Sequence, residues 1–217
     1  MSNTLFLRLE GPLQSWGERS PWSIRDTAPE PTKSGVVGLL ACALGWSDDE
    51  HIAALARQLR IGVRCDRSSS ALLEDYHTVG GGYRTPMLLT AEGKRKISNK
   101  RPHTEQTWRW YLCDASFLAA VQSEPEDAGL IARLAEAVQS PAWPIYLGRK
   151  SCVPTRPVFA GLGSHDSLLA ALQAVSLPAR APGDEGPRRV RAVLECSPED
   201  ADSVRRRHQL RSRTFRL

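Results

Sequence analysis

Two short stretches of this 217-residue chain combine glycine, serine and basic residues in a pattern that suits phosphate binding. The first, KSG at 33–35, begins an apolar run that predicts a helix over 34–45 with Ser34 as its N-cap. Free N–H groups and the dipole at a helix start favour an anion, so this stretch is either a plain cap or a phosphate site. The second, GRKS at 148–151, joins a glycine that permits close backbone approach to two cations that can grip phosphates.

The other residue types give little support for nucleotide hydrolysis or metal chemistry. The stretch PTKS at 31–34 lacks the glycines of a P-loop, which disfavours an ATPase. The five histidines share no metal-ligand spacing and the five cysteines form no Cys-x-x-Cys pair, so we expect neither a metal nor a cofactor. His77, in DYH at 75–77, is either a general acid or base or a histidine with a structural hydrogen bond, which is the more common situation.

The positive charge of the chain is concentrated in two segments. The net charge is +5, but residues 84–109 contain seven basic and two acidic residues, and residues 188–217 contain nine and four. The remaining parts of the chain are net negative. Because focused basic charge attracts polyanions, the internal segment predicts contact with nucleic acid. The arginine-rich tail contacts nucleic acid or an acidic neighbour, or is simply solvated, and its composition favours the last.

Hydrophobic periodicity predicts an α+β domain that positions these residues. The order strand, helix, strand, strand, helix is typical of ferredoxin-like or RRM-like domains, whose sheet packs helices on one face and can offer the other to RNA. Within the predicted strand at 107–122, Trp108 and Trp110 share one face and Arg109 lies on the other, so one face can meet RNA or another subunit. The predicted strands are 4–10, 61–66, 71–79, 107–122 (bent at 113–114) and 190–196, and the predicted helices are 34–45, 48–60, 126–140 and 166–175.

Targeting signals are not evident. The longest apolar stretch, Gly35 to Trp46, is too short to span a bilayer, and the N-terminus has neither a basic leader nor a small-residue cleavage site. Scattered cysteines in an odd number suit a reducing compartment. We therefore expect a cytoplasmic protein without membrane contact.

Five stretches, taken together and in order, resemble the CasD family, whose members hold the 5′ handle of the guide RNA in type I-E CRISPR Cascade complexes. These stretches are LRLEGPLQSWG (7–17), PTKSGVVGLLACALG (31–45), DYHTVGG (75–81), TWRWYLCDASF (107–117) and PIYLGRKSC (144–152). The resemblance spans residues 5 to about 160, and the C-terminal 50 or so residues are not diagnostic.

The resemblance implies a modified RRM-like (RAMP-type) fold with a protruding thumb. We expect an RRM-like domain at 1–163, a basic thumb inserted at about 80–106, and a small C-terminal extension at 164–217 that ends in the arginine-rich tail. The expected partners are the crRNA 5′ handle, the CasC backbone subunit and the CasA large subunit, with other Cascade subunits and target DNA reached through the complex.

The resemblance also implies which residues hold the RNA. No catalytic residue is expected, because in type I-E systems the separate subunit CasE cuts the precursor RNA. The expected RNA-binding residues are Lys33, Ser34, Gly35, Trp108, Arg109, Tyr146, Gly148, Arg149, Lys150 and Ser151, and the expected thumb residues are Arg84, Lys94, Arg95, Lys96, Lys100 and Arg101.

Three function classes follow. The favoured one is a non-catalytic, RNA-binding scaffold subunit in antiviral defence. The alternative is a metal-independent CRISPR repeat RNA endonuclease, as in the sister family of type I-C systems, which would use His77 or Tyr76 with a nearby lysine. This sequence lacks an obvious Lys-His pair at a matching position. A pure protein-interaction module would leave the segregated charge unexplained.

Overall fold

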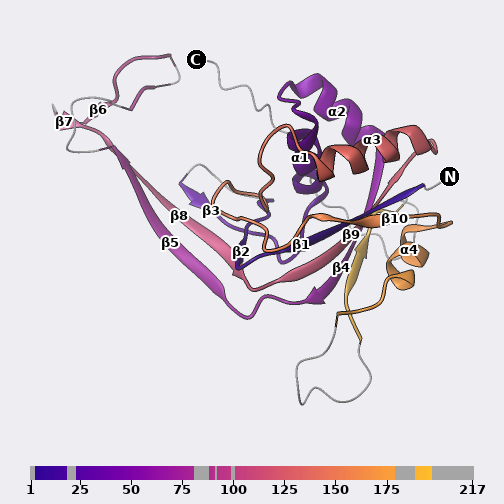
Figure 1. Ribbon diagram of the computed structural model, residues 1–217. Coiled ribbons are helices and arrows are strands. Elements are labelled where there is room, and N and C mark those ends of the chain that lie inside the picture. The colour runs from indigo at the N-terminus through magenta and orange to yellow at the C-terminus, as the bar shows by residue number, and fades with distance from the viewer. Residues whose placement is uncertain are drawn as a thin grey trace.

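The computed structural model describes residues 3–18, 23–80, 88–90, 92–98, 101–178 and 189–196, with the backbone alone at 98, 101 and 102 (Figure 1). The predicted thumb residues Arg84 and Lys100 and the arginine-rich tail beyond residue 196 lie outside these ranges. Among the helices in these ranges, none is long and apolar enough to cross a membrane.

A five-stranded sheet forms the centre of the fold, in the order β10-β1-β9-β4-β11. Every neighbouring pair is antiparallel, so β1 and β4 run parallel to each other with β9 between them. This split β-α-β arrangement is the ferredoxin-like topology, and it confirms the predicted α+β fold class. The strands are β1 (Thr4–Glu10), β4 (Leu59–Arg67), β9 (Ser116–Ser123), β10 (Phe159–Gly163) and β11 (Ala192–Leu194).

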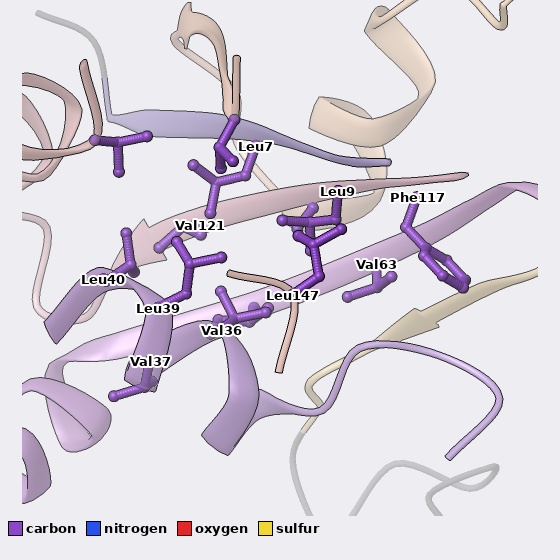
Figure 2. Close-up of a cluster of buried hydrophobic side chains, with 14 of the residues drawn as sticks. Leu7, Leu9, Val36, Val37, Leu39, Leu40, Val63, Phe117, Val121 and Leu147 are labelled. Atoms are coloured by element: carbon purple, nitrogen blue, oxygen red, sulfur yellow. The ribbon is translucent and has the colours of Figure 1, made fainter. Parts of the chain in front are cut away.

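Three helices cover one face of this sheet: α1 (Lys33–Leu44), α2 (Asp49–Gln58) and α3 (Ala128–Gln139). Helix α1 packs against both α2 and α3, and eight consecutive residues of it, 36–43, are buried. The sheet contributes the alternating side chains that point to this face, which produces one continuous apolar core (Figure 2). Core residues labelled in Figure 2 include Leu7, Leu9, Val36, Leu40, Val63, Phe117, Val121 and Leu147.

The start of α1 differs from the prediction. Thr32, not Ser34, is the N-cap: its backbone is extended and its side chain accepts a hydrogen bond from the Gly35 N–H at 3.2 Å. Lys33 is therefore the first helical residue. The helix ends at Gly45, whose φ of 73° is the left-handed conformation that glycine adopts readily.

The RRM-like prediction allowed the opposite face of the sheet to be open. This face is instead partly covered, because α4 (Leu168–Ala174) packs against β4 and β9 there. Its side chains join Phe6, Leu118 and Ala120 in a second apolar cluster. The buried Arg64 guanidinium donates to the carbonyl oxygens of Leu172, Val175 and Ser176, just where the helix ends. Cationic donors at a helix C-terminus satisfy its free carbonyls, so Arg64 fixes α4 to the sheet.

A long β-hairpin projects from the central sheet between β4 and β9 (Figure 1). Its arms are β5 (Leu72–Gly80) and β8 (Thr104–Cys113), and every residue of β5 pairs with one of β8. The predicted bend at 113–114 is confirmed: Asp114 has a φ of 53° and separates β8 from β9. Two short strands, β2 (Leu13–Gln14) and β3 (Ile24–Arg25), pair with β8 on its other side, and β6 (Ile97–Ser98) pairs with β7 (Arg101–Pro102) toward the tip.

The loop that carries the GRKS stretch packs closely on the core. Leu147 is buried and its N–H donates to the Cys152 carbonyl at 2.8 Å, which closes a turn over residues 148–151. Gly148 has a φ of +89°, and a Cβ at this position would lie 1.7 Å from the carbonyl oxygen of Ser15. Glycine is therefore needed for the backbone conformation and for this close approach, before any role toward a phosphate.

The buried carboxylate of Asp66 generates a stability prediction. It accepts from Arg64 Nε at 2.6 Å and from Arg8, and its side chain is fully buried. Asp66→Ala should reduce the free energy of unfolding by about 3–5 kcal/mol, because it leaves a buried guanidinium uncompensated. The exposed Arg60–Glu124 pair is the matched control, and Glu124→Ala should cost at most about 1 kcal/mol. Urea unfolding measures both, and equal losses would contradict this assignment.

Gly148 generates a second prediction. Gly148→Ala should lower the free energy of unfolding by about 2–5 kcal/mol, since it adds left-handed strain to a steric clash. Gly93 is the control: its φ is +77°, but no atom of the described residues lies within 4 Å of the position that a Cβ would occupy there. Gly93→Ala should show only the conformational cost of about 1–2 kcal/mol. Urea unfolding of both variants checks the difference, and a Gly148→Ala loss no larger than that of Gly93→Ala would be the contrary result.

Candidate nucleic-acid interface

The two faces of strand β8 carry different chemistry. Cross-strand partners share a face, and Trp108 lies opposite Ile24 of β3 and Tyr76 of β5. The next residue, Arg109, lies opposite Arg25 of β3 and Asp75 of β5. The structure therefore has an aromatic face, defined by Ile24, Trp108 and Tyr76, and on the reverse an arginine face. The predicted separation of Trp108 and Trp110 from Arg109 is confirmed by the strand.

Arg149 joins Arg25 and Arg109 on the arginine face. Its Nη2 donates to the Arg25 carbonyl at 2.8 Å, and its guanidinium lies 4.7 Å from the ring centroid of Tyr111, which shares a face with Arg109. Its Nη1 atom is buried and has no hydrogen-bond partner among the described residues. We call Arg25, Arg109 and Arg149 the arginine cluster. The GRKS loop and strand β8, far apart in sequence, thus meet at one site.

The charges of Arg109 and Arg149 act on the third guanidinium group, that of Arg25. The pKa of Arg25 is lowered, first by partial burial and then by the nearby charges of Arg109 and Arg149. Like charges held together in a partly buried site are unfavourable, and a bound anion relieves both the repulsion and the unmet donor of Arg149. Guanidinium groups also match the geometry of phosphate oxygens. The cluster is therefore suited to bind the phosphates of a polyanion.

Arg25 is not among the binding residues expected from the sequence. It lies in a two-residue strand within residues 11–33, where the sequence predicts neither a strand nor a helix and no periodicity marks it as a neighbour of Arg109. The sequence offers only a weak indication, which is an arginine in a long segment without predicted elements that has to fold back over the domain.

The other residues of the GRKS loop lie beside the cluster. Lys150 and Ser151 are exposed at the turn that follows Arg149, whose carbonyl accepts from the Cys152 N–H at 2.8 Å. Tyr146 is half-buried in the segment that leads into the turn. Gly148 packs against Ser15, as described above, so its demonstrated role is in packing.

The KSG stretch has partners within the chain. Lys33 Nζ lies 2.5 Å from Glu195 Oε1, and Glu195 also accepts from the Ile61 N–H at 3.2 Å. The hydroxyl of Ser34 lies 3.3 Å from that of Thr32, and a Cβ at Gly35 would lie 2.7 Å from the Trp16 ring. A phosphate that approaches Lys33 must therefore compete with the Glu195 carboxylate.

The predicted thumb residues are divided. Lys94 and Arg95 are exposed, whereas Lys96 Nζ lies 2.5 Å from Glu105 Oε2, which is also 3.2 Å from His103 Nε2. The pKa of the Glu105 carboxyl is lowered, chiefly by the hydrogen bond from Lys96. Lys96 thus has an internal counterion. Only the backbone is described for Arg101, in β7.

The residues considered for catalysis are exposed on β5. His77 Nδ1 lies 3.6 Å from Asp75 Oδ2, and the Tyr76 ring packs 5.4 Å from that of Trp108. At 3.6 Å the contact between His77 and Asp75 is longer than a hydrogen bond, so Asp75 orients the exposed His77 ring only loosely. Within the ranges that the structure covers, no group of three or more His, Cys, Asp or Glu residues is arranged to hold a metal ion.

Comparisons with known proteins agree with this architecture. The model of a family described as "CRISPR-associated protein (Cas_Cas5)" matches residues 4–217. The CRISPR system Cascade subunit CasD of Escherichia coli (strain K12) is 41% identical over 170 residues, which are 74% of this chain and 71% of that protein.

Two solved structures are also similar. A chain of a CRISPR RNA-guided surveillance complex matches with a TM-score of 0.66 and 35% identity, over 83% of this chain and 72% of that one. A chain from a structure described as a Cas protein matches with a TM-score of 0.52 and 39% identity, over 78% and 69%. The resemblance to CasD seen in the sequence is confirmed, and the chain belongs to the Cas5 family of CRISPR-associated proteins.

Proposed function

We propose that this chain is the non-catalytic RNA-binding subunit of a type I-E CRISPR surveillance complex, Cascade, and that it caps the 5′ handle of the crRNA for antiviral defence. The 41% identity to a Cascade subunit supports membership of the complex. The observation that carries the RNA-binding role is the arginine cluster, in which the buried Arg149 Nη1 has no partner among the described residues.

In this proposal the arginine cluster binds successive phosphates of single-stranded RNA. Arg149 is held in place by Tyr111 and by the Arg25 carbonyl, so little side-chain entropy is lost when it meets an anion. Lys150 and Ser151 extend the same loop into solvent and add a further phosphate contact. Phosphate contacts position the strand and do not by themselves read its sequence.

Residues of the KSG stretch and of the thumb have secondary roles in the proposal. Lys33, Ser34 and Gly35 offer a phosphate contact that requires Lys33 to exchange Glu195 for RNA. The exposed thumb residues Lys94 and Arg95 lie along the RNA or under a neighbouring subunit. The proposed protein neighbours are the CasC backbone subunit and the CasA large subunit. Other Cascade subunits and target DNA are reached through the complex.

The salt dependence of RNA binding tests this site. Arg109→Gln with Arg149→Gln should weaken binding of the isolated chain to repeat-derived RNA and reduce the slope of log K against log salt by about 0.7 for each phosphate that the protein no longer neutralises. Replacing Lys33 or Lys150 by Ala should have smaller effects of the same kind. Arg133→Gln is the control, because Arg133 is an arginine of α3 that lies over the Trp46 ring and does not belong to the arginine cluster. A double variant that keeps the wild-type slope, with an unchanged melting temperature, would exclude the cluster as the site.

RNA cleavage separates the scaffold from the endonuclease alternative. The chain incubated with end-labelled repeat RNA in EDTA should shift the RNA on a native gel and leave it intact on a denaturing gel. His77→Ala and Tyr76→Phe should give the same two results. Cleavage that either substitution abolishes would establish a metal-independent nuclease instead.

A further inference from the structure

We propose that the aromatic face of the β5–β8 hairpin, with the pocket at its base, docks an extended apolar segment of a neighbouring protein subunit. The inference rests on the proposed function, because it names the surface by which a subunit of such a complex holds a protein partner. RNA is assigned to the opposite side of the same strands, where the arginine cluster lies, so Trp108, expected from the sequence to bind RNA, is assigned to the protein interface instead.

The pocket has a volume of about 390 Å³ and lies where the hairpin meets the domain. Its walls come from three parts of the chain: the loop before α1, the connection from β4 to β5 with the base of the hairpin, and the segment before β11. This volume falls in the range of about 300–1,000 Å³ that is usual for binding pockets. The lining residues are Thr27, Pro29, Glu30, Cys65, Ser68, Ser69, Ala71, Leu72, Leu112 and Arg191.

Polar groups of the pocket are already engaged inside the chain. The Ser69 hydroxyl donates to the Ala71 carbonyl at 2.6 Å and accepts from the Cys113 N–H at 2.8 Å. The Thr27 hydroxyl likewise has a donor and an acceptor partner, at 2.9 and 3.0 Å. The buried Glu30 carboxylate lies 2.7 Å from Arg191 Nη2.

The surface left for a ligand is therefore mainly apolar. It consists of Pro29, Ala71, Leu72 and Leu112. A nucleobase is recognised through donors and acceptors on its edges as well as by stacking, and the Ser69 and Thr27 hydroxyls and the Glu30 carboxylate of this pocket already have partners. An aliphatic or aromatic side chain needs only apolar contact, so it is the better fit.

The aromatic face continues this apolar surface along the hairpin. Leu72 lies opposite Leu112, and Tyr76 lies opposite Trp108, so both pairs share one face. Leu72 is 62% exposed, Tyr76 53% and Ile24 47%. Several large exposed apolar residues on one face, here interrupted only by Glu74, are typical of an interaction site. Leu72 and Tyr76 are four residues apart, about 13 Å, the same spacing that an extended segment gives to side chains i and i+4.

The charge on this face disfavours RNA and favours a basic protein segment. Glu74 lies between Leu72 and Tyr76 on the same face, opposite Trp110, and is exposed. Its carboxylate repels phosphate but attracts a lysine or arginine. Arg191, the cation of the pocket, is paired with Glu30. The partner segment is thus apolar, with one large side chain for the pocket and a basic residue near Glu74.

A matched pair of double variants tests the proposal. Leu72→Ser with Tyr76→Ser alters the aromatic face, and Leu73→Ser with Val79→Ser alters the reverse of the same strand, where these residues are 45% and 40% exposed. Each full-length variant is co-expressed with the guide RNA and the other Cascade subunits. Subunit composition is measured by gel filtration and denaturing gels, and RNA binding of the isolated chain by gel shift.

The aromatic-face variant should lose a protein subunit, or bind it about tenfold or more weakly, while its RNA affinity stays within about twofold of wild type. The reverse-face variant should assemble normally. Ala71→Phe is the second probe, because it fills the pocket without removing an exposed side chain, and it should produce the same loss. If the double variant has a lowered melting temperature, the assembly of Ala71→Phe decides whether this surface docks a subunit.

Normal assembly of both the aromatic-face variant and Ala71→Phe would overturn the docking surface and leave the proposed function intact. An RNA affinity that falls together with assembly would also overturn it, since the face would then hold RNA. A wild-type chain that binds no RNA and enters no complex would overturn the proposed function itself, and the docking surface with it.

Discussion

The pairing register of β8 is the constraint on which the rest of the interface depends. A shift of one residue would exchange the two faces, moving Arg109 to the aromatic side and Trp108 to the arginine side. Interactions at the base hold the register: the Cys113 N–H donates to the Ser69 hydroxyl and the Ala71 carbonyl, and the Ser15 hydroxyl donates to the Trp110 carbonyl. The left-handed Asp114 then bends the chain from β8 into the buried strand β9. Because β9 is paired on both sides, with β1 and with β4, the register of the central sheet also determines the register of the hairpin.

That register also explains why one thin hairpin can offer two chemistries. A two-layer domain shields one face of its sheet with helices, but β5 is largely uncovered by the described parts of the chain, and eight of its nine residues are exposed. Alternate side chains of the hairpin therefore point to two exposed faces, and each face can bind a different ligand. The arginine side is completed by Arg149 from a distant loop, and the aromatic side by the pocket at the base. Both additions occur where the hairpin joins the domain, so they are supported by the core rather than by the hairpin alone.

The elements with clear periodicity were predictable from the sequence, and the irregular ones were not. Strand β1, the helices α1 to α4 and the bend at 113–114 follow from local patterns, and the strand order completes the expected ferredoxin-like plan. Strand β10 falls in a region where the sequence predicts no strand, because Phe159–Gly163 contains two glycines and lies beside a proline-rich segment. Thr32 replaces Ser34 as the cap because either hydroxyl satisfies the pattern, and only the geometry of the chain entering α1 selects between them.

The same limit applies to the candidate site. Sequence marks Arg109, Arg149 and Lys150 as basic residues in suggestive contexts, but it does not show that Lys33 and Lys96 have carboxylate partners at 2.5 Å. These partners are distant in sequence or lie across a turn, at Glu195 and Glu105. Counting charge along the chain therefore overstates the cations available to RNA. What distinguishes Arg149 is the opposite situation: its Nη1 is buried without a partner in the described part of the chain, beside two more guanidinium groups. Buried donors in folded proteins usually have a hydrogen-bond partner, so the unsatisfied Arg149 Nη1 indicates a ligand. The positive charges of Arg25 and Arg109 beside it indicate that this ligand is an anion.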